Sequence, residues 1–543
     1  MEGIIVVVVI ILVYVIISNY YRIQWNKQKK KQVKEQYGRR PEHKEKDVKR
    51  IRFYLESQPV EGDVDEITWK DLSMDEVFWR VNNCVSSAGE EILYEAMHHT
   101  RNSKEALEEL EQSVQYFSEQ KEVREQVLMC LMQLGKKDAS YYIPPYMASI
   151  EENRLGYTMI FRILQILPLV FLSGFLILRE FVFLGLFAGN IILNIVIYAL
   201  VKMRYETNLS MLGILCSILK TARMLDKLEC EEHFCRKIKE VLLPLKKAGR
   251  IIEKMQRVQN NALSSELGGL EDYILGATLW HLTMYNKSIN MLIQYKAEYM
   301  KLYEMIGAID MAISIASFRK SIPSYTTPEF WKNNKVELEE AYHPLIENPV
   351  CNSMNWEKNC IITGSNASGK STFIKTVAVN MILAQSIHTC TAQKARMPQA
   401  DVITSMAVQD DIMSGDSYFI KEVKYLKRML EHLNSERSTI CIVDEILRGT
   451  NTKERIAASR AIMEYLSKEN CLVMVASHDQ ELTVLLGNVY DNYHFSEKIG
   501  QQDIIFDYKL YKGPADSNNA IRLLEYMGFP SQIISDAKLH VQG

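Results

Sequence analysis

The sequence contains no CxxC pair, although ten cysteines are spread through its 543 residues. This absence excludes the closely spaced thiol pairs on which many zinc sites are built. Cys230, His233 and Cys235 lie near one another, but their spacing is poor for zinc and a fourth ligand is missing. Scattered, unpaired cysteines are typical of a protein body held in a reducing, cytosolic compartment.

Positive charge is scarce outside one short segment. Residues 22–50 hold twelve Lys and Arg against four Asp and Glu, a net charge of +8. Because the whole chain has a net charge of −3, the remaining residues together carry −11. A protein that wraps duplex DNA usually has a basic surface. Outside residues 22–50 this chain has no overall excess of basic residues, although a net negative charge is compatible with a local basic patch. The basic segment is either a flank that binds anionic lipid or a nucleic-acid arm. Its position directly after an apolar run favours the flank.

Two regions carry apolar runs of membrane-spanning length. The first, residues 4–17, extends to about residue 21 and approaches the ~20 residues that a bilayer-spanning helix needs. It is not a typical cleavable signal peptide, because its lysines follow the run and no A-x-A site is present. The second, residues 163–201, is divided by Arg179 and Glu180 and predicts a transmembrane helical hairpin. The alternative is a hydrophobic hairpin buried in a soluble core, because the first half is short and contains Pro168.

The flanking charges predict an orientation. Lysines follow the first run, so the positive-inside rule places residue 1 outside and residue 30 in the cytoplasm. Lys202 and Arg204 follow the hairpin on the same inner side. Three spans therefore predict a multi-pass protein of the cell membrane whose C-terminal half faces the cytoplasm.

Long helices are predicted on both sides of the hairpin. Residues 45–160 and 202–320 contain few Pro or Gly and carry apolar residues at helical spacing. Pro244 and the stretch 264–269 are expected to break the second block. These helices are expected either to form a bundle or to act as levers that transmit motion. Hydrophobic periodicity by itself indicates only that each helix packs one face against other elements.

A phosphate-binding loop is predicted near the middle of the C-terminal half. The apolar run "NCIIT", residues 359–363, suits a buried strand, and G-x-x-x-x-G-K-[ST] follows it. Glycines let backbone N–H groups converge on phosphate oxygens, and the next helix adds its N-terminal dipole. Lys370 is expected to reach the β and γ phosphates of ATP, and Ser371 to hold Mg²⁺. The expected ATP-binding residues are Gly364, Ser365, Asn366, Ala367, Ser368, Gly369, Lys370, Ser371 and Thr372.

Two further apolar runs end in polar residues that suit hydrolysis. "STICIVDEI" ends in Asp444 and Glu445, and "CLVMVAS" is followed by His478. Asp444 is expected to hold Mg²⁺ through water, Glu445 to polarise the attacking water, and His478 to contact the γ-phosphate. The simpler alternatives are a pair of surface acids and a structural histidine. The position of each residue directly after a buried strand favours the catalytic roles.

A Ser-Gly pair at Ser414 and Gly415 lies between the loop and the acids. Its N–H groups can bind phosphate at a helix start, although within one subunit it would lie far from Lys370. In ABC-type ATPases such a segment completes the partner's site, which predicts a head-to-tail homodimer with nucleotide between the two ATPase domains.

Together these segments resemble the MutS family of ABC-type ATPases over about residues 50–543, apart from the apolar hairpin. "TGSNASGKST" is similar to the family's TGxNxxGKST loop, "DEILRGT" to its DE-x-x-RGT segment and "AYHPLIENPV" to the His-Pro segment near the adenine. "SGDSYFIKEV" resembles the SGxSTFxxE signature, with Tyr418 in place of Thr. The resemblance implies a phosphate contact from Asn366, a dimer-interface loop at 449–451 and ATP-driven switching of a dimer.

The departures from the family concern DNA. The mismatch-reading domain with its Phe-x-Glu wedge has no counterpart, and the apolar hairpin interrupts the helical core about where the family's DNA clamp would be inserted. The leading hypothesis is a membrane-anchored ATPase that hydrolyses ATP with Mg²⁺ in a composite homodimer site and moves helical levers. This hypothesis includes contact with membrane lipid. The resemblance to the MutS family adds the expectation that the protein binds mismatched or branched DNA, as in DNA mismatch repair. The alternative is a membrane scaffold or remodelling ATPase that does not bind DNA.

The expected fold class is a C-terminal α/β ABC-type P-loop ATPase domain joined to an all-α core and lever region, with about three transmembrane helices. The expected divisions are an anchor at 1–21, a basic segment at 22–50, helical core at 51–156, a transmembrane hairpin at 157–202, a second core and lever part at 203–325, and the ATPase domain at 326–543.

Overall fold

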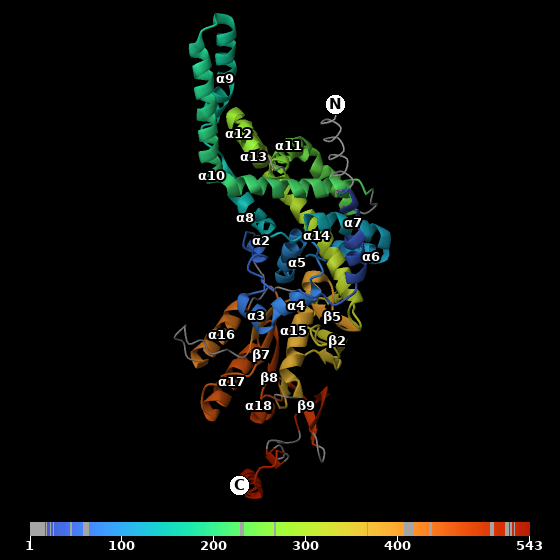
Figure 1. The fold of residues 1–543 in the computed structure, drawn as a ribbon. Helices are drawn as coiled ribbons and strands as arrows, with labels where there is room; N and C mark the ends of the chain where they lie inside the picture. The colour runs from blue at the N-terminus through green and yellow to red at the C-terminus, as the bar shows by residue number, and fades with distance from the viewer. Residues whose placement is uncertain are drawn as a thin grey trace.

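The computed structural model has a helical upper part and an α/β lower part, with the C-terminus at the end farthest from a projecting helical hairpin (Figure 1). Apart from single positions near the two ends, it describes residues 27–43, 46–57, 64–228, 233–264, 268–365, 368–406, 418–433, 437–499, 504–515 and 527–542. The predicted first membrane span falls almost entirely outside the described residues.

Side chains cap the starts of three helices in the helical part. Asp65 accepts from the N–H groups of Ile67 and Thr68 at the start of the helix Glu66–Asp71, while Ser86 and Ser103 cap the helices that begin at Ser87 and Lys104. The helices before the hairpin are α2 (Arg52–Ser57), α3 (Glu66–Asp71), α4 (Met74–Val81), α5 (Ser87–His98), α6 (Lys104–Glu119), α7 (Lys121–Leu134) and α8 (Ile143–Ala148), with 3₁₀ turns at Asp138–Tyr142 and Ile150–Asn153. Those after it are α11 (His233–Ser264), α12 (Gly268–Thr278), α13 (Trp280–Gln294) and α14 (Lys296–Lys320).

Helix α14 packs closely on α5 through a buried polar contact. The Asp310 carboxylate accepts from the Ser86 N–H at 2.8 Å and from its hydroxyl at 2.5 Å, so it closes the start of α5 from the side. Burial raises the pKa of Asp310 to about 6, against the opposing effect of these hydrogen bonds. A Cβ on Gly307 would meet Ile92 Cγ1 at 2.4 Å, so the two helices approach where a side chain is missing.

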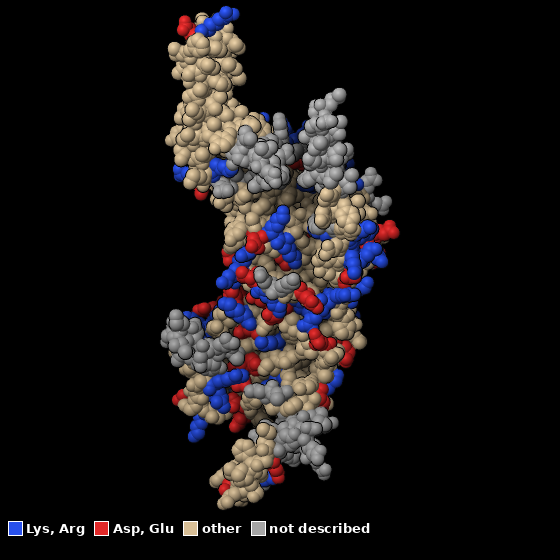
Figure 2. All heavy atoms as spheres, in the orientation of Figure 1, with Lys and Arg blue, Asp and Glu red and all other residues tan. Residues whose placement is uncertain are grey.

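The apolar hairpin consists of α9 (Thr158–Leu178) and α10 (Phe181–Asp226), which are joined through Arg179 in a left-handed conformation. Two stretches, Ile150–Leu178 and Phe181–Tyr205, are long and apolar enough to cross a bilayer, yet only 11% and 17% of their most apolar windows are buried. Figure 2 shows this hairpin as a column without charge except near its two ends. An apolar surface turned outward does not fit the alternative of a hairpin buried in a soluble core.

Two helix boundaries differ from expectation. Helix α10 continues past the apolar stretch into the helical part, with a kink at Tyr205 (φ −117°). The expected break at Pro244 is wrong, because Pro244 lies inside α11. A proline removes one helical hydrogen bond and disfavours a helix interior, but tertiary packing overrides this local preference.

The α/β part contains two sheets. A six-stranded sheet has the order β10-β9-β4-β8-β7-β6, in which only the edge strand β10 is antiparallel to its neighbour, and a four-stranded sheet has the order β1-β5-β2-β3. The strands are β1 (Glu329–Trp331), β2 (Val336–Ala341), β3 (Asn352–Trp356), β4 (Cys360–Thr363), β5 (Lys394–Pro398), β6 (Asp401–Ser405), β7 (Thr439–Asp444), β8 (Cys471–Ala476), β9 (Asp491–Ile499) and β10 (Ile504–Lys512). The helices are α15 (Lys370–Ile387), α16 (Tyr418–His432), α17 (Thr452–Leu466), α18 (Gln480–Leu485) and α20 (Ser531–Gln542).

One apolar core runs through both parts. Helix α15 lies between the sheet and α5, and its buried side chains belong to the same cluster as those of the helical part. The N-terminal segment also reaches across: the Gly38 N–H donates to the Ser317 hydroxyl at 2.9 Å, and Arg40 pairs with Glu347 at 2.9 Å. The α/β part with its two sheets and the helical region agree with the expected fold class. They do not establish the number of membrane spans.

Candidate nucleotide-binding site

The predicted phosphate-binding loop connects β4 to α15 and depends on two glycines. Gly364 has φ +137° and Gly369 has φ +105°, which are values that side-chain-bearing residues rarely adopt. A Cβ on Gly364 would also meet the Phe495 carbonyl oxygen at 2.8 Å. Gly369 is the N-cap of α15, so the loop ends at a helix N-terminus, which attracts anions. Asn366 and Ala367 lie outside the described residues.

Lys370 occupies the centre of this loop. Its side chain is fully buried, and its ammonium donates to the Gly364 carbonyl oxygen and lies 3.3 Å from His478 Nε2. The Ser368 hydroxyl donates to the Ser365 carbonyl oxygen at 2.6 Å and closes the loop from within. Ser371 and Thr372 follow in the first turn of α15.

The phosphate-binding loop, Glu445 and His478 lie at the carboxyl ends of three neighbouring strands of the six-stranded sheet. Strand β8 lies between β4 and β7, all three run parallel, and Asp444 stands opposite Ala476 in the register. The loop after β4, His478 after β8 and Glu445 after β7 therefore meet at the carboxyl ends of neighbouring strands. Asp444 is the last residue of β7 and is 8% exposed.

Glu445 is held in place by backbone and side-chain contacts. It has a left-handed backbone (φ +67°), and its N–H donates to the Ala476 carbonyl oxygen at 2.9 Å. Its carboxylate lies 3.1 Å from His478 Nε2 and pairs with Arg448. Burial acts to raise the pKa of Glu445, but the His478 hydrogen bond and the Arg448 charge outweigh it and lower the pKa below its ordinary value. The site therefore holds an ionised carboxylate next to the His478–Lys370 pair.

A cavity of about 300 Å³ opens beside the loop. It is lined by Ala341, Tyr342, His343, Ile346, Asn348, Pro349, Val350, Asn352, Gly369, Thr372, Phe373, Thr376, Phe495 and Tyr508. Burial, together with the Lys375 charge, lowers the pKa of His343 to about 4, so its imidazole is neutral at physiological pH. A neutral ring among aromatic and apolar groups suits a planar base. Phe495 and Tyr508 come from β9 and β10. No motif in the sequence marked Phe495, and Tyr508 lies in a segment, residues 504–530, that resembles the tail of the family's ATPase domain.

The segment after Glu445 is fixed against α16 and α17. A Cβ on Gly449 would meet the Phe419 side chain at 3.0 Å, and the Gly449 N–H donates to Glu422 at 3.4 Å. Asn451 caps α17 by accepting from the Glu454 N–H at 3.0 Å. Ser414 and Gly415, predicted to complete a partner's site, lie outside the described residues.

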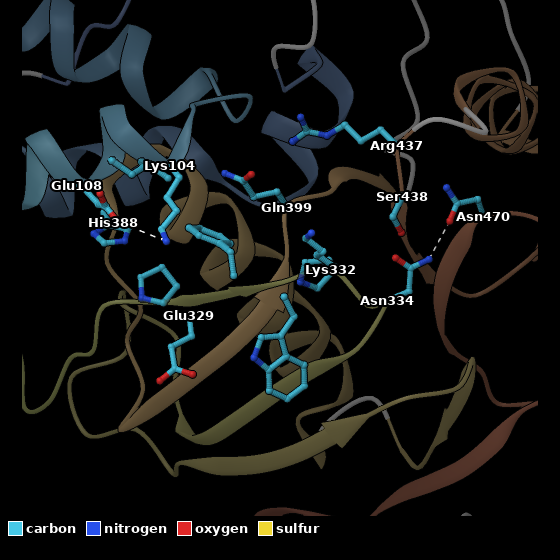
Figure 3. Close-up of a pocket in the computed structure, with 15 residues that line it drawn as sticks. Lys104, Glu108, Glu329, Lys332, Asn334, His388, Gln399, Arg437, Ser438 and Asn470 are labelled. Atoms are coloured by element: carbon cyan, nitrogen blue, oxygen red, sulfur yellow. Dashed lines mark hydrogen bonds and ion pairs between the residues drawn. The ribbon is translucent and has the colours of Figure 1, made fainter.

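A larger cavity of about 830 Å³ lies away from this loop, between α6 and the four-stranded sheet. Figure 3 shows Lys104 and Glu108 of α6 on one side of it and Asn334, bonded to Asn470, on the other. Among the described residues that line it, none belongs to the loop or follows β7 or β8. Cavity size alone therefore does not identify the nucleotide site in this protein.

Comparison with known proteins agrees with this geometry. Residues 360–543 match the family model of MutS domain V. The DNA mismatch repair protein MutS of Thermotoga petrophila is 32% identical over 254 residues, which are 45% of this chain and 32% of that protein. The protein of the same name from Clostridium kluyveri is 29% identical over 298 residues, 51% of this chain and 34% of that protein. The chain thus spans about a third of the length of the curated relatives it matches. Residues 360–543 are thus similar to MutS domain V, and about half of the chain is similar to proteins named DNA mismatch repair protein MutS.

Proposed function

We propose that this protein is a membrane-associated ATPase that binds ATP with Mg²⁺ at the loop between β4 and α15. The observation that carries the proposal is a buried Lys370 enclosed by the loop, with His478 and the ionised Glu445 beside it. The MutS domain V match over residues 360–543 supports the same chemistry. The proposed ATPase domain is residues 326–543, and the other divisions expected from the sequence are proposed with it.

Different residues of the site bind the phosphates, the base, the metal ion and the attacking water. The loop N–H groups and the Lys370 ammonium bind phosphate oxygens, and the cavity beside His343 receives the base. Ser371 and Asp444 would hold Mg²⁺, which neutralises negative charge on the phosphates. Glu445 orients a water molecule and accepts its proton, and the imidazole of His478, 3.1 Å from the carboxylate, keeps that carboxylate pointed into the site.

We propose further that two copies close over the nucleotide. Ser414 and Gly415 of one subunit would reach the phosphate of the other, and the 449–451 loop would lie at the interface between them. The rigid attachment of Gly449 and Asn451 to their own helices supports a role for this loop as a preformed contact surface.

The α9–α10 hairpin is the proposed membrane attachment. Its outward-facing apolar side chains, its length and its charged turn at Arg179 and Glu180 support insertion from one side of a bilayer. The proposed orientation keeps the ATPase domain in the cytoplasm.

Two functions are proposed for the motion that ATP hydrolysis drives. Relatives named for DNA mismatch repair favour binding of mismatched or branched DNA. The net charge of −11 outside residues 22–50 favours a scaffold or remodelling ATPase that does not use DNA. A salt titration of duplex, mismatched and branched DNA binding by detergent-purified protein, with and without ATP, separates the two, since phosphate contacts give a steep salt dependence. An absence of binding at low salt removes the DNA candidate.

The catalytic proposal is tested with Glu445→Gln. The amide keeps the size of the side chain but cannot accept the proton, so turnover should fall by a factor on the order of 10²–10³ while ATP binding persists. The matched control is Glu464→Gln in α17, where the carboxylate only pairs with Arg460 on the surface. Equal ATP turnover by wild type and Glu445→Gln would reject the role assigned to Glu445.

A further inference from the structure

A second, shorter helical hairpin stands beside the base of the apolar one. It consists of α12 and α13, which are joined at Leu279 in a left-handed conformation (φ +46°). Figure 1 shows both helices next to the lower half of the α9–α10 pair. No motif marked this pair in the sequence, and the proposed ATPase chemistry does not use it.

The turn of this second hairpin is fixed to the first by polar and close contacts. The fully buried Asn194 of α10 donates to the carbonyl oxygens of Leu164 at 3.1 Å and of Ala277 at 3.0 Å, and so joins α9, α10 and α12. A Cβ on Gly276 would meet Ile195 Cα at 3.2 Å, which indicates close backbone packing of α12 on α10. Three elements therefore form one unit at this level.

The position of the unit along the hairpin follows from helix geometry. Leu164 lies six residues after the start of α9, which corresponds to about 9 Å along its axis at ~1.5 Å per residue. The turn between α12 and α13 thus reaches the beginning of the apolar region, which the sequence places near residue 163. A bilayer that contains the hairpin would have its headgroup layer at about this level.

The outer face of α12 is apolar and exposed. Tyr273 is 61% and Ile274 is 59% exposed, whereas the next residue, Leu275, is 8% exposed. Tyr157 and Met159 at the start of α9 are similarly exposed, at 78% and 71%. These exposed side chains lie on α9 and α12, which Asn194 joins near the start of the apolar stretch, and Figure 2 shows both basic and acidic residues near the base of the hairpin. Exposed aromatic and apolar side chains at the base of an apolar hairpin are typical of a protein surface in the interfacial layer of a membrane.

We propose that the α12–α13 turn is an interfacial membrane-binding element, in which Tyr273 and Ile274 lie among the headgroups and upper acyl chains of the leaflet that the hairpin enters. The occupant of this face is lipid, because α12 is attached to α9 and α10 at the level where their apolar stretches begin. The inference rests on the proposed membrane insertion of the hairpin. Since α13 leads directly into α14, which reaches the ATPase domain, the element joins the lipid surface to the helix that packs against α5.

The test places an environment-sensitive fluorescent amino acid, introduced by amber suppression, at position 274 of the full-length protein. Matched labels go to Val170, 54% exposed in the middle of α9, and to Val484, 82% exposed on α18 of the ATPase domain. Each protein is reconstituted into vesicles of phosphatidylcholine and phosphatidylglycerol. Quenching is measured with aqueous iodide and with lipids that carry a nitroxide near the headgroup or near the chain end.

The label at 274 should resist iodide several-fold better than the label at 484 and should be quenched more by the shallow nitroxide than by the deep one. A label at 170 quenched by the deep nitroxide, together with a label at 274 fully open to iodide, overturns the inference and leaves the membrane proposal standing. Stronger quenching at 274 by the deep nitroxide overturns the interfacial placement. Iodide access at both 170 and 274 overturns the inference and the proposed membrane insertion together.

Discussion

The ion pair between Glu111 and Arg319 should determine how firmly α6 holds the end of α14 next to the ATPase domain. The Arg319 guanidinium donates to both Glu111 carboxylate oxygens, at 2.7 and 2.6 Å, and His388 Nδ1 lies 3.1 Å from the same carboxylate. Arg319 is 6% exposed and also donates to the His388 carbonyl oxygen at 2.9 Å. Three segments that are far apart in the sequence therefore depend on one carboxylate.

The size of this contribution follows from the pKa of Glu111. Burial acts to raise it, but the hydrogen bonds from Arg319 and His388 outweigh burial and lower the pKa from 4.5 to about 2. At about 1.4 kcal/mol per unit, and with a reduction for the quarter of the side chain that is exposed, the charge contributes roughly 2–3 kcal/mol at neutral pH. Glu111→Gln keeps the shape, removes this charge and leaves the Arg319 charge buried with less compensation.

Hydrogen exchange of the full-length protein measures the effect locally. Amides in the C-terminal halves of α6 and α14 should exchange roughly 30- to 150-fold faster in Glu111→Gln at neutral pH. Because the folded-state pKa lies below the unfolded-state pKa, the contribution is complete above about pH 4.5 and is lost as the pH falls toward about 2. The difference in thermal unfolding midpoint between wild type and Glu111→Gln should therefore become smaller as the pH is lowered.

Glu108→Gln is the matched control on the same helix. Its carboxylate is 55% exposed and lies 3.6 Å from Lys104, an arrangement that contributes only about 0.3–0.5 kcal/mol. If Glu111→Gln exchanged no faster than Glu108→Gln, or if its effect were the same at pH 3 and pH 7, the reasoning would be refuted.

Two further predictions concern packing and nucleotide affinity. Gly307→Ala should lower the thermal midpoint by an amount equivalent to about 1–3 kcal/mol, because its Cβ would meet Ile92 Cγ1 at 2.4 Å and the Ala88 carbonyl oxygen at 2.7 Å. Gly185→Ala, which would meet nothing within 4 Å, is the control, and an equal effect from both would contradict the packing argument. His343→Ala should weaken binding of a fluorescent ATP analogue by about 0.5–1.5 kcal/mol, because it removes a ring from the cavity beside the loop. His540→Ala on the exposed α20 should leave affinity unchanged, and unchanged affinity in His343→Ala would remove that cavity as the base site.

Local features of this protein were determined by the sequence alone. The strand, loop and helix around Lys370 were predictable because two glycines at fixed spacing are needed for the loop backbone, and because short β-branched runs suit buried parallel strands. The hairpin was predictable because Arg179 and Glu180 interrupt an otherwise apolar stretch. The resemblance to the MutS family followed from the same motifs, and the domain V match over residues 360–543 supports it. The catalytic roles of Glu445 and His478 stay predictions.

The tertiary structure alone decided which distant residues meet. Phe495 and Tyr508 reach the loop only because β9 lies next to β4 in the sheet, and Glu111 meets Arg319 only because α6 and α14 pack together. The attachment of α12 to Asn194 likewise joins segments 83 residues apart. Hydrophobic periodicity and backbone preference act over a few residues, so they specify elements and turns. The order in which those elements pack is a property of the whole buried core, and it is this order that assembles the cavity, the ion pair and the membrane-facing unit.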